Sequence, residues 1–183
     1  MSNLDEGKLI EMFQKENTRH EAFSLLVKEY SEQLYWLIRK IVISHDDAND
    51  VLQNTFIKVW TNLDNFRGDS KLITWFYKIA TNESITFLNK QRSHTNIPID
   101  DNDNLLHTKL ESDVYFDGDE AQLKLQKAVL RLPDKQRLVF TMKYFEEMKY
   151  EEISKILDTS VGALKASYHH SVKKIEEYLS NLD

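Results

Sequence analysis

The first half of the chain repeats apolar residues at the spacing of amphipathic helices. From Phe23 to Ile41, successive apolar positions lie three, one, three, four, three, one and three residues apart, which is the period of a helix with one buried stripe. The same period returns from Ala48 to Trp60 and from Leu72 to Ile85. Polar breaks separate these segments, one at Ser44, a helix-capping residue type, and one around Gly68. The pattern therefore predicts three helices in this half.

A second helical block follows in the last third of the chain. Apolar residues resume at Leu123–Leu132 and continue through Leu138–Phe145. A short amphipathic stretch, Tyr150–Leu157, is followed by a turn and by a longer helix that begins near Ser160. The apolar stripe of that last helix consists of Val161, Leu164, Tyr168, Val172, Ile175 and Leu179. Two helices joined by a short turn in this way are typical of a helix-turn-helix.

The stretch between the two blocks is acidic. Residues 94–122 carry one basic and eight acidic side chains, whereas residues 1–93 carry 12 basic and 13 acidic and residues 123–183 carry 11 and 9. Few apolar residues and many like charges favour a solvated, flexible connection. We therefore predict an all-α protein with two small helical domains, residues 1–93 and 122–183, joined by an acidic flexible linker over residues 94–121.

Composition narrows the kinds of function that the chain can have. It contains no Cys and only four Gly among 183 residues, which argues against disulfides, thiol catalysis, cysteine-bound metals and glycine-rich phosphate loops. The first residues do not show the basic segment followed by an apolar run that marks a secretory signal. No apolar run approaches the length of about 18 residues that a membrane-spanning helix needs. We therefore expect a cytoplasmic protein without a secretory signal or a membrane span. The net charge of −6 still allows a basic local surface that binds nucleic acid.

The exposed face of the last helix suits nucleic acid. It offers Lys165, Ser167, His169, His170, Lys173 and Lys174. No acidic residue occurs between Val161 and Ile175, so this face can lie against the phosphates that line a major groove. The alternative interpretation is an ordinary helical hairpin whose lysines are solvated.

Aromatic and basic residues also gather beside the break around Gly68. Trp60 and Phe76 fit the apolar stripes and are expected in the core. Trp75, Tyr77 and Lys78 cannot all point inward, because consecutive helix positions are about 100° apart. Part of this aromatic and basic surface must therefore be exposed, and exposed rings with cations are what the binding of single-stranded DNA requires.

The two blocks resemble, in this order, regions 2 and 4 of the bacterial sigma-70 family of RNA polymerase sigma factors, of the short extracytoplasmic-function type. Residues 46–60 are similar to the helix that docks on the polymerase clamp. Residues 66–82 are similar to the loop and helix that open the −10 promoter element. Residues 132–140, with 150–165, are similar to the helices of region 4 that read the −35 element.

The resemblance implies a role for each matching residue. It implies that polymerase is bound by Asp50, Gln53, Asn54 and Phe56. It implies that −10 DNA is bound by Phe66, Arg67, Gly68, Asp69, Ser70, Lys71, Trp75, Lys78 and Asn82. It implies that −35 DNA is bound by Lys165, Ala166, Ser167, His169, His170, Lys173 and Lys174. Many relatives have Glu in place of Asn54 and more arginine in the last helix, so base preferences at −35 do not carry over directly.

The resemblance also implies partners. These are core RNA polymerase, contacted at its clamp and flap, promoter DNA, and an anti-sigma factor that masks the binding surfaces. It implies no catalytic residue, no metal and no cofactor in this chain, because the polymerase performs the chemistry.

Three alternatives stay open at this point. A polymerase-independent regulator would use the helix-turn-helix alone, and a structural helical adaptor would not bind DNA. A metal-dependent hydrolase would be centred on His45 and Asp46. No second His-Asp pair and no ligand-spaced histidine accompany that pair, and Ser44 with Asp47 fits a helix cap instead.

Overall fold

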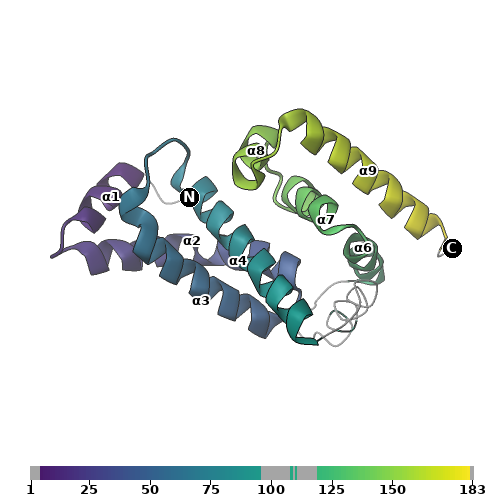
Figure 1. Cartoon of the computed structure of the whole chain (residues 1–183), viewed down its shortest axis with the longest axis horizontal. Helices are drawn as coiled ribbons and strands as arrows, with labels where there is room; N and C mark the ends of the chain where they lie inside the picture. Colours follow the sequence, from purple (N-terminus) through teal and green to yellow (C-terminus); the bar gives the residue numbers. More distant parts are fainter. Residues whose placement is uncertain (1–4, 96–107, 109, 111–118, 182–183) are drawn as a thin grey trace.

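The computed structural model describes residues 5–95, 108, 110 and 119–181, and it contains helices but no strand among them. The N-terminal domain comprises α1 (Glu6–Gln14), α2 (Arg19–Val42), α3 (His45–Asn62), the short 3-10 turn η1 (Leu63–Asn65) and α4 (Leu72–Thr95). The C-terminal domain comprises α6 (Glu120–Leu130), α7 (Asp134–Phe140), the π-helical turn η3 (Thr141–Phe145), α8 (Tyr150–Leu157) and α9 (Val161–Ser180). The all-α prediction is confirmed (Figure 1).

The proposed boundaries and linker fall near the ends of these helices. The helix α4 runs two residues past the predicted boundary at 93, and α6 begins two residues before the boundary at 122. Most of the predicted linker, and with it the prediction that it is flexible, lies outside the described residues. In the part of the chain that the structure describes, no helix is both long and apolar enough to cross a bilayer.

The N-terminal domain buries the stripes that the sequence predicted. Leu26, Leu34 and Phe76 are completely buried in one apolar core that α2, α3 and α4 share. The hydroxyl of Ser44 accepts a hydrogen bond from the Asp47 backbone N–H at 3.4 Å, so the predicted cap fixes the start of α3. In α3, the apolar period and the capping residue therefore agree.

The helix α1 was not predicted. Asp5 caps it by accepting a hydrogen bond from the Gly7 backbone N–H at 3.0 Å. Leu9 and Phe13, one turn apart, are both buried against the core. The cap and this i, i+4 pair were the available signals, but the segment is too short to show a full apolar period.

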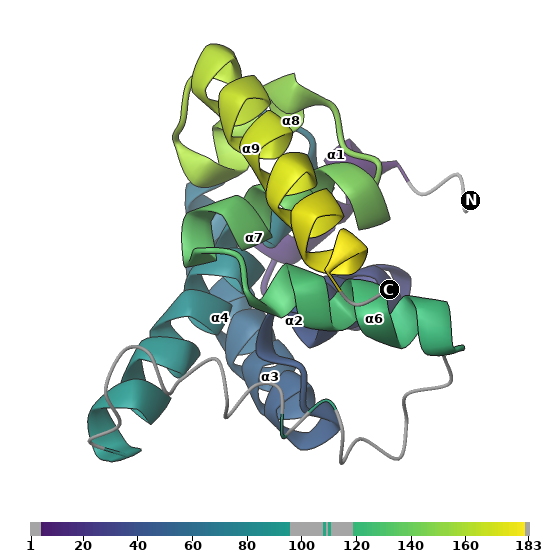
Figure 2. The ribbon, with the colours of Figure 1, turned by 90° about the vertical axis from the view of Figure 1, so that its right-hand side faces the viewer.

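The C-terminal domain contains the predicted helix-turn-helix in α8 and α9. The helix α8 ends at Leu157, and the residue that caps this end, Asp158, has a left-handed backbone (φ +49°). The hydroxyl of Ser160 then accepts from the Ala163 N–H at 3.3 Å and caps α9. Phe140 lies between Tyr144 and Tyr168, stacked on both rings with centroid distances of 5.0 and 5.7 Å. This stack fixes α9 on α7, which lies between α9 and α4 (Figures 1 and 2).

The two domains pack against each other. The buried apolar cluster of the N-terminal domain continues into Leu138, Met142 and Ile153 of the C-terminal domain. Ion pairs between described residues also cross the boundary: Lys40 with Glu146 at 2.6 Å, Lys78 with Asp158 at 2.8 Å and Arg92 with Asp134 at 2.7 Å. We call this packing the closed arrangement. Patterns along the sequence predicted two domains but gave no indication of these contacts.

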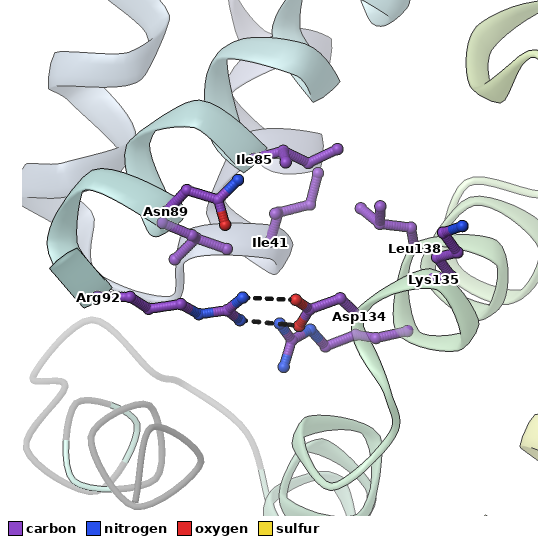
Figure 3. Close-up of a pocket in the computed structure, with 9 residues that line it drawn as sticks. Ile41, Ile85, Asn89, Arg92, Asp134, Lys135 and Leu138 are labelled. Atoms are coloured by element: carbon purple, nitrogen blue, oxygen red, sulfur yellow. Dashed lines mark hydrogen bonds and ion pairs between the residues drawn. The ribbon is translucent and has the colours of Figure 1, made fainter. Parts of the chain in front are cut away.

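A cavity of about 230 Å³ lies at the boundary between the domains. Its walls are mainly apolar, with Ile41, Ile85 and Leu88 from one domain and Leu138 from the other (Figure 3). Arg92 lies beside it and donates two hydrogen bonds to Asp134, at 2.7 and 2.9 Å. The hydrogen bond from Arg92 lowers the pKa of Asp134 below its ordinary value, against the opposing effect of burial.

Candidate nucleic-acid interface

The outer face of α9 is exposed and basic. We call the following exposed residues the basic face: Lys165, Ala166, His169, His170, Lys173 and Lys174. Ser167, which was predicted with them, is half-buried. The structure therefore brings the predicted −35 residues together on one surface of one helix.

The inner side of α9 holds the basic face in place. Leu164 is completely buried, and Ser171 donates a hydrogen bond to the Ser167 carbonyl at 2.8 Å and one to the Gln136 carbonyl of α7 at 3.3 Å. The ammonium group of Lys165 lies 5.8 Å from the centre of the Tyr150 ring. Because α9 is anchored through its buried side, its exposed side chains present a fixed pattern to a ligand.

Residues 66–71, which we call the glycine loop, connect η1 to α4. Arg67, Gly68, Asp69 and Lys71 are exposed, and Ser70 is half-buried. Gly68 has φ +74° with open space where a Cβ would point, so a side chain there would strain the backbone without meeting an obstacle. Phe66 is half-buried, with its ring 5.5 Å from that of Trp75 on α4. This aromatic contact anchors the start of the loop, while most of its other residues are exposed.

The first turns of α4 carry the remaining predicted −10 residues. Trp75, Tyr77 and Lys78 are all half-buried, and Asn82 is exposed. The Tyr77 ring faces the C-terminal domain, and burial, followed by the nearby Glu146 and Glu152 carboxylates, raises its pKa to about 12. Tyr77 therefore belongs to the domain boundary in the closed arrangement.

The helix-turn-helix lies against this surface. Asp158, at the turn between α8 and α9, pairs with Lys78 of α4. Lys155 of α8 donates a hydrogen bond to the Asp69 carbonyl of the glycine loop at 3.3 Å. The closed arrangement therefore partly covers the predicted −10 surface while it leaves the basic face exposed.

The exposed side of α3 presents a mixed polar and apolar surface. Asp50, Gln53 and Asn54 are exposed, as predicted for a protein-binding surface. Phe56 is only 9% exposed, because it lies on the apolar stripe and its ring packs edge-on against Phe23 at 6.2 Å. Ile57, which the sequence analysis did not single out, is 56% exposed and lies one helical turn after Gln53. The apolar contribution to this α3 face is therefore Ile57 and not Phe56.

His45 has a structural explanation. Its Nδ1 lies 2.7 Å from the Tyr35 hydroxyl and its Nε2 lies 3.0 Å from the Asn49 side-chain nitrogen. Both ring nitrogens are therefore engaged within the helix pair. Among the described residues, no group of three or more His, Cys, Asp or Glu side chains is placed to hold a metal ion.

Comparison with known families matches both halves of the chain. The sigma-70 region 2 model matches residues 26–94, and the sigma-70 region 4 model matches residues 122–175. The first match contains α3, the glycine loop and most of α4, and the second contains the helix-turn-helix. The helix α1 lies outside both matches.

Full-length relatives agree with the family models. The ECF RNA polymerase sigma factor SigW of Bacillus subtilis is 29% identical over 170 residues, covering 88% of this chain and 91% of the relative. The ECF RNA polymerase sigma-E factor of Escherichia coli K12 is 30% identical over 189 residues, covering 98% and 96%.

Solved structures share the fold. One holds CnrH in complex with the cytosolic domain of CnrY, with a TM-score of 0.67 at 21% identity, covering 94% of this chain and 97% of CnrH. Another holds the sigma factor RpoE in complex with the anti-sigma factor NepR from Bartonella quintana, with a TM-score of 0.66 at 19% identity, covering 86% and 96%.

Proposed function

The chain belongs to the sigma-70 family and is an extracytoplasmic-function sigma factor, and from this premise we propose which of its surfaces carry out promoter-specific initiation. One observation supports the assignment above the others: a basic helix-turn-helix face and an aromatic, glycine-containing loop occur in one chain, each within its own family match. The first suits duplex DNA and the second suits unpaired DNA.

The basic face enters the major groove of the −35 element. Lys173 and Lys174 contact phosphates, and Lys165, His169 and His170 contact phosphates or base edges. Lysine charges provide most of the affinity through release of counterions, whereas the side chains that reach bases provide sequence preference. Ala166 and Ser167 permit close approach of the helix to the groove.

The glycine loop and the start of α4 open the −10 element. The loop, Phe66 to Lys71, receives a base flipped out of the duplex, and Trp75, Lys78 and Asn82 line the path of the separated strand. Unstacking a base costs a few kcal/mol, which aromatic stacking and contacts to the strand offset. Lys78 becomes available for this role only when its pair with Asp158 separates. We infer that the domains move apart when polymerase and promoter bind.

Core polymerase binds the exposed α3 face, Asp50, Gln53, Asn54 and Ile57. The polymerase catalyses RNA synthesis, and the chain itself performs no chemical step and requires no cofactor. Because bacterial RNA polymerase synthesises RNA in the cytoplasm, we propose that the chain acts there. An anti-sigma factor is a further proposed partner, because the solved structure of RpoE holds it in complex with the anti-sigma factor NepR.

Reconstitution tests this assignment. Core polymerase mixed with the chain should initiate transcription at a defined subset of a promoter library, read by sequencing the RNA 5′ ends. Core polymerase alone is the control and should give no such subset. If the mixture starts RNA no more selectively than core polymerase, the proposed function is wrong. Copurification of the chain with core polymerase separates this proposal from a polymerase-independent regulator, which would not bind it.

Ile57→Asp should weaken polymerase binding about tenfold, because partner contact with a half-exposed isoleucine contributes about 1.5 kcal/mol. Titration of fluorescently labelled chain with core polymerase measures the change. The matched control is Trp36→Asp, which adds the same charge at another half-exposed apolar side chain, on α2. Equal affinities for the Ile57→Asp variant and the unmodified chain would show that the α3 face is not the contact surface.

A further inference from the structure

The helix α1 lies outside both family matches, and the resemblance drawn from the sequence assigns it no role. It lies at the same end of the molecule as the glycine loop (Figure 1). Its apolar side, Leu9 and Phe13, is buried in the N-terminal core, which explains why the helix stays attached. In addition to this apolar packing, a polar residue of α1 accepts hydrogen bonds from two other helices.

That residue is Glu6. One carboxylate oxygen, Oε1, accepts a hydrogen bond from the Tyr30 hydroxyl at 3.1 Å. The other, Oε2, accepts a hydrogen bond from the backbone N–H of Leu72 at 3.2 Å. Both donor residues are buried, with Tyr30 9% and Leu72 0% exposed. A single carboxylate from α1 therefore bridges α2 and the first residue of α4.

The Leu72 N–H that Glu6 contacts belongs to the first residue of α4. The first four N–H groups of a helix have no partner within the helix, and the helix dipole favours a negative charge beside them. Glu6 supplies both the acceptor and the charge to α4 from a separate helix. Burial, and then the Glu6 carboxylate itself, raise the pKa of Tyr30 above its ordinary value, so the Tyr30 hydroxyl stays protonated and donates its hydrogen bond to Glu6.

The segment that precedes the glycine loop is also contacted by residues of α1 and the start of α2. The Phe13 ring of α1 packs edge-on against Trp60 of α3, with centroids 5.3 Å apart. Arg19, at the start of α2, pairs with Asp64 of η1 at 2.7 Å. Its guanidinium group lies 4.1 Å from the centre of the Phe13 ring. Contacts from residues 6–19 therefore fix η1 before the loop and α4 after it.

We propose that α1 is a brace for the promoter-opening loop and that Glu6 is a positioning residue, which fixes the start of α4 so that the loop can capture an unpaired base. The inference rests on the proposed function of the glycine loop. Glu6 itself does not need to touch DNA. Its effect is confined to the step that separates the strands, because the basic face and the α3 face lie on other elements.

Glu6→Ala in the full chain, with core polymerase, should slow open-complex formation about tenfold. This is the fold-change expected when the hydrogen bond from the Leu72 N–H to the charged carboxylate, the one of the two that holds the start of α4, is lost. The probe is a promoter carrying 2-aminopurine in the −10 element, whose fluorescence rises on unstacking. Glu11→Ala is the matched control, because Glu11 is exposed on the same helix and should leave the rate unchanged. Glu6→Gln, which keeps an amide oxygen as acceptor, should restore the rate to within about threefold.

Two further measurements separate positioning from loss of fold. On a template whose −10 bases are already unpaired, the Glu6→Ala defect should shrink to about twofold, since the cost of unstacking is removed. Amide exchange at Leu72 should accelerate, while binding to a −35 duplex stays unchanged. The proposal would be overturned if the Glu6→Ala variant opened the promoter as fast as the Glu11→Ala variant. It would also be overturned if the Glu6→Ala defect were as large on the unpaired template as on the duplex. Absence of selective initiation by the unmodified chain would instead reject the proposed function.

Discussion

Simultaneous Lys165→Glu and Lys173→Glu should lower the affinity of the chain for a −35 duplex about a hundredfold. Both side chains are exposed on the basic face. Each replacement removes a charge-assisted contact to DNA, and two such losses amount to about 3 kcal/mol. Because each lysine displaces counterions, the dependence of the binding constant on salt should also become shallower, by about two in its logarithmic slope. Fluorescence anisotropy of labelled duplex across a salt series measures both effects.

Polymerase binding should not change in this double variant, because the α3 face lies on the other domain. Lys8→Glu with Lys28→Glu is the matched control. It makes the same change in net charge at two exposed lysines of the N-terminal domain and should leave duplex binding within about twofold at moderate salt. If the control lowers affinity as much as the α9 variant, net charge and not the basic face governs binding.

Lys78→Glu should reduce open-complex formation about 30-fold. It removes a cation from the path of the separated strand and places a carboxylate there, a change of about 2 kcal/mol. The same substitution sets two carboxylates together at the Lys78–Asp158 pair, so it also favours separation of the domains. The pair is accessible to solvent, with the Lys78 side chain 38% and the Asp158 side chain 74% exposed, so it contributes only about 1 kcal/mol or less.

A charge swap separates these two effects. Lys78→Glu combined with Asp158→Lys restores an ion pair across the boundary but not a cation on α4. Energy transfer between dyes on the two domains should report closure like that of the unmodified chain, while opening of the −10 element stays impaired. Asp158→Lys alone is the control, which weakens closure and leaves Lys78 in place. Recovery of opening in the double variant would show that Lys78 acts through domain closure rather than on DNA.

The helices were predictable because each carries its own local signals. The stripes from Phe23 to Ile85, the Ser44 and Ser160 caps and the helix-turn-helix all depend on neighbours a few residues apart. The structure adds the first turn of α2, which begins at Arg19. Apolar period marks where a helix is buried, and this turn is largely polar, so the pattern did not include it.

The contacts that the sequence did not predict join residues far apart in the chain. Glu6 and Leu72 are separated by 66 positions, and Lys78 and Asp158 by 80. No local pattern indicates that two such residues will meet, because their proximity is set by how whole helices pack.

The incorrect surface assignment of Phe56 has a different cause. Its place on the apolar stripe of α3 already pointed to the core, whereas the resemblance placed it on the surface, and the packing against Phe23 agrees with the stripe.

The cavity between Ile41, Ile85 and Leu138 exists only while the domains are together, since each contributes part of its wall. A small apolar molecule that fills it can bind the closed arrangement alone. Such binding would lower the free energy of that state by an amount set by ligand concentration over Kd. Polymerase and promoter, which require the domains to separate, would then have to overcome this added stability of the closed arrangement. A ligand in the cavity would therefore reduce initiation without touching DNA or polymerase.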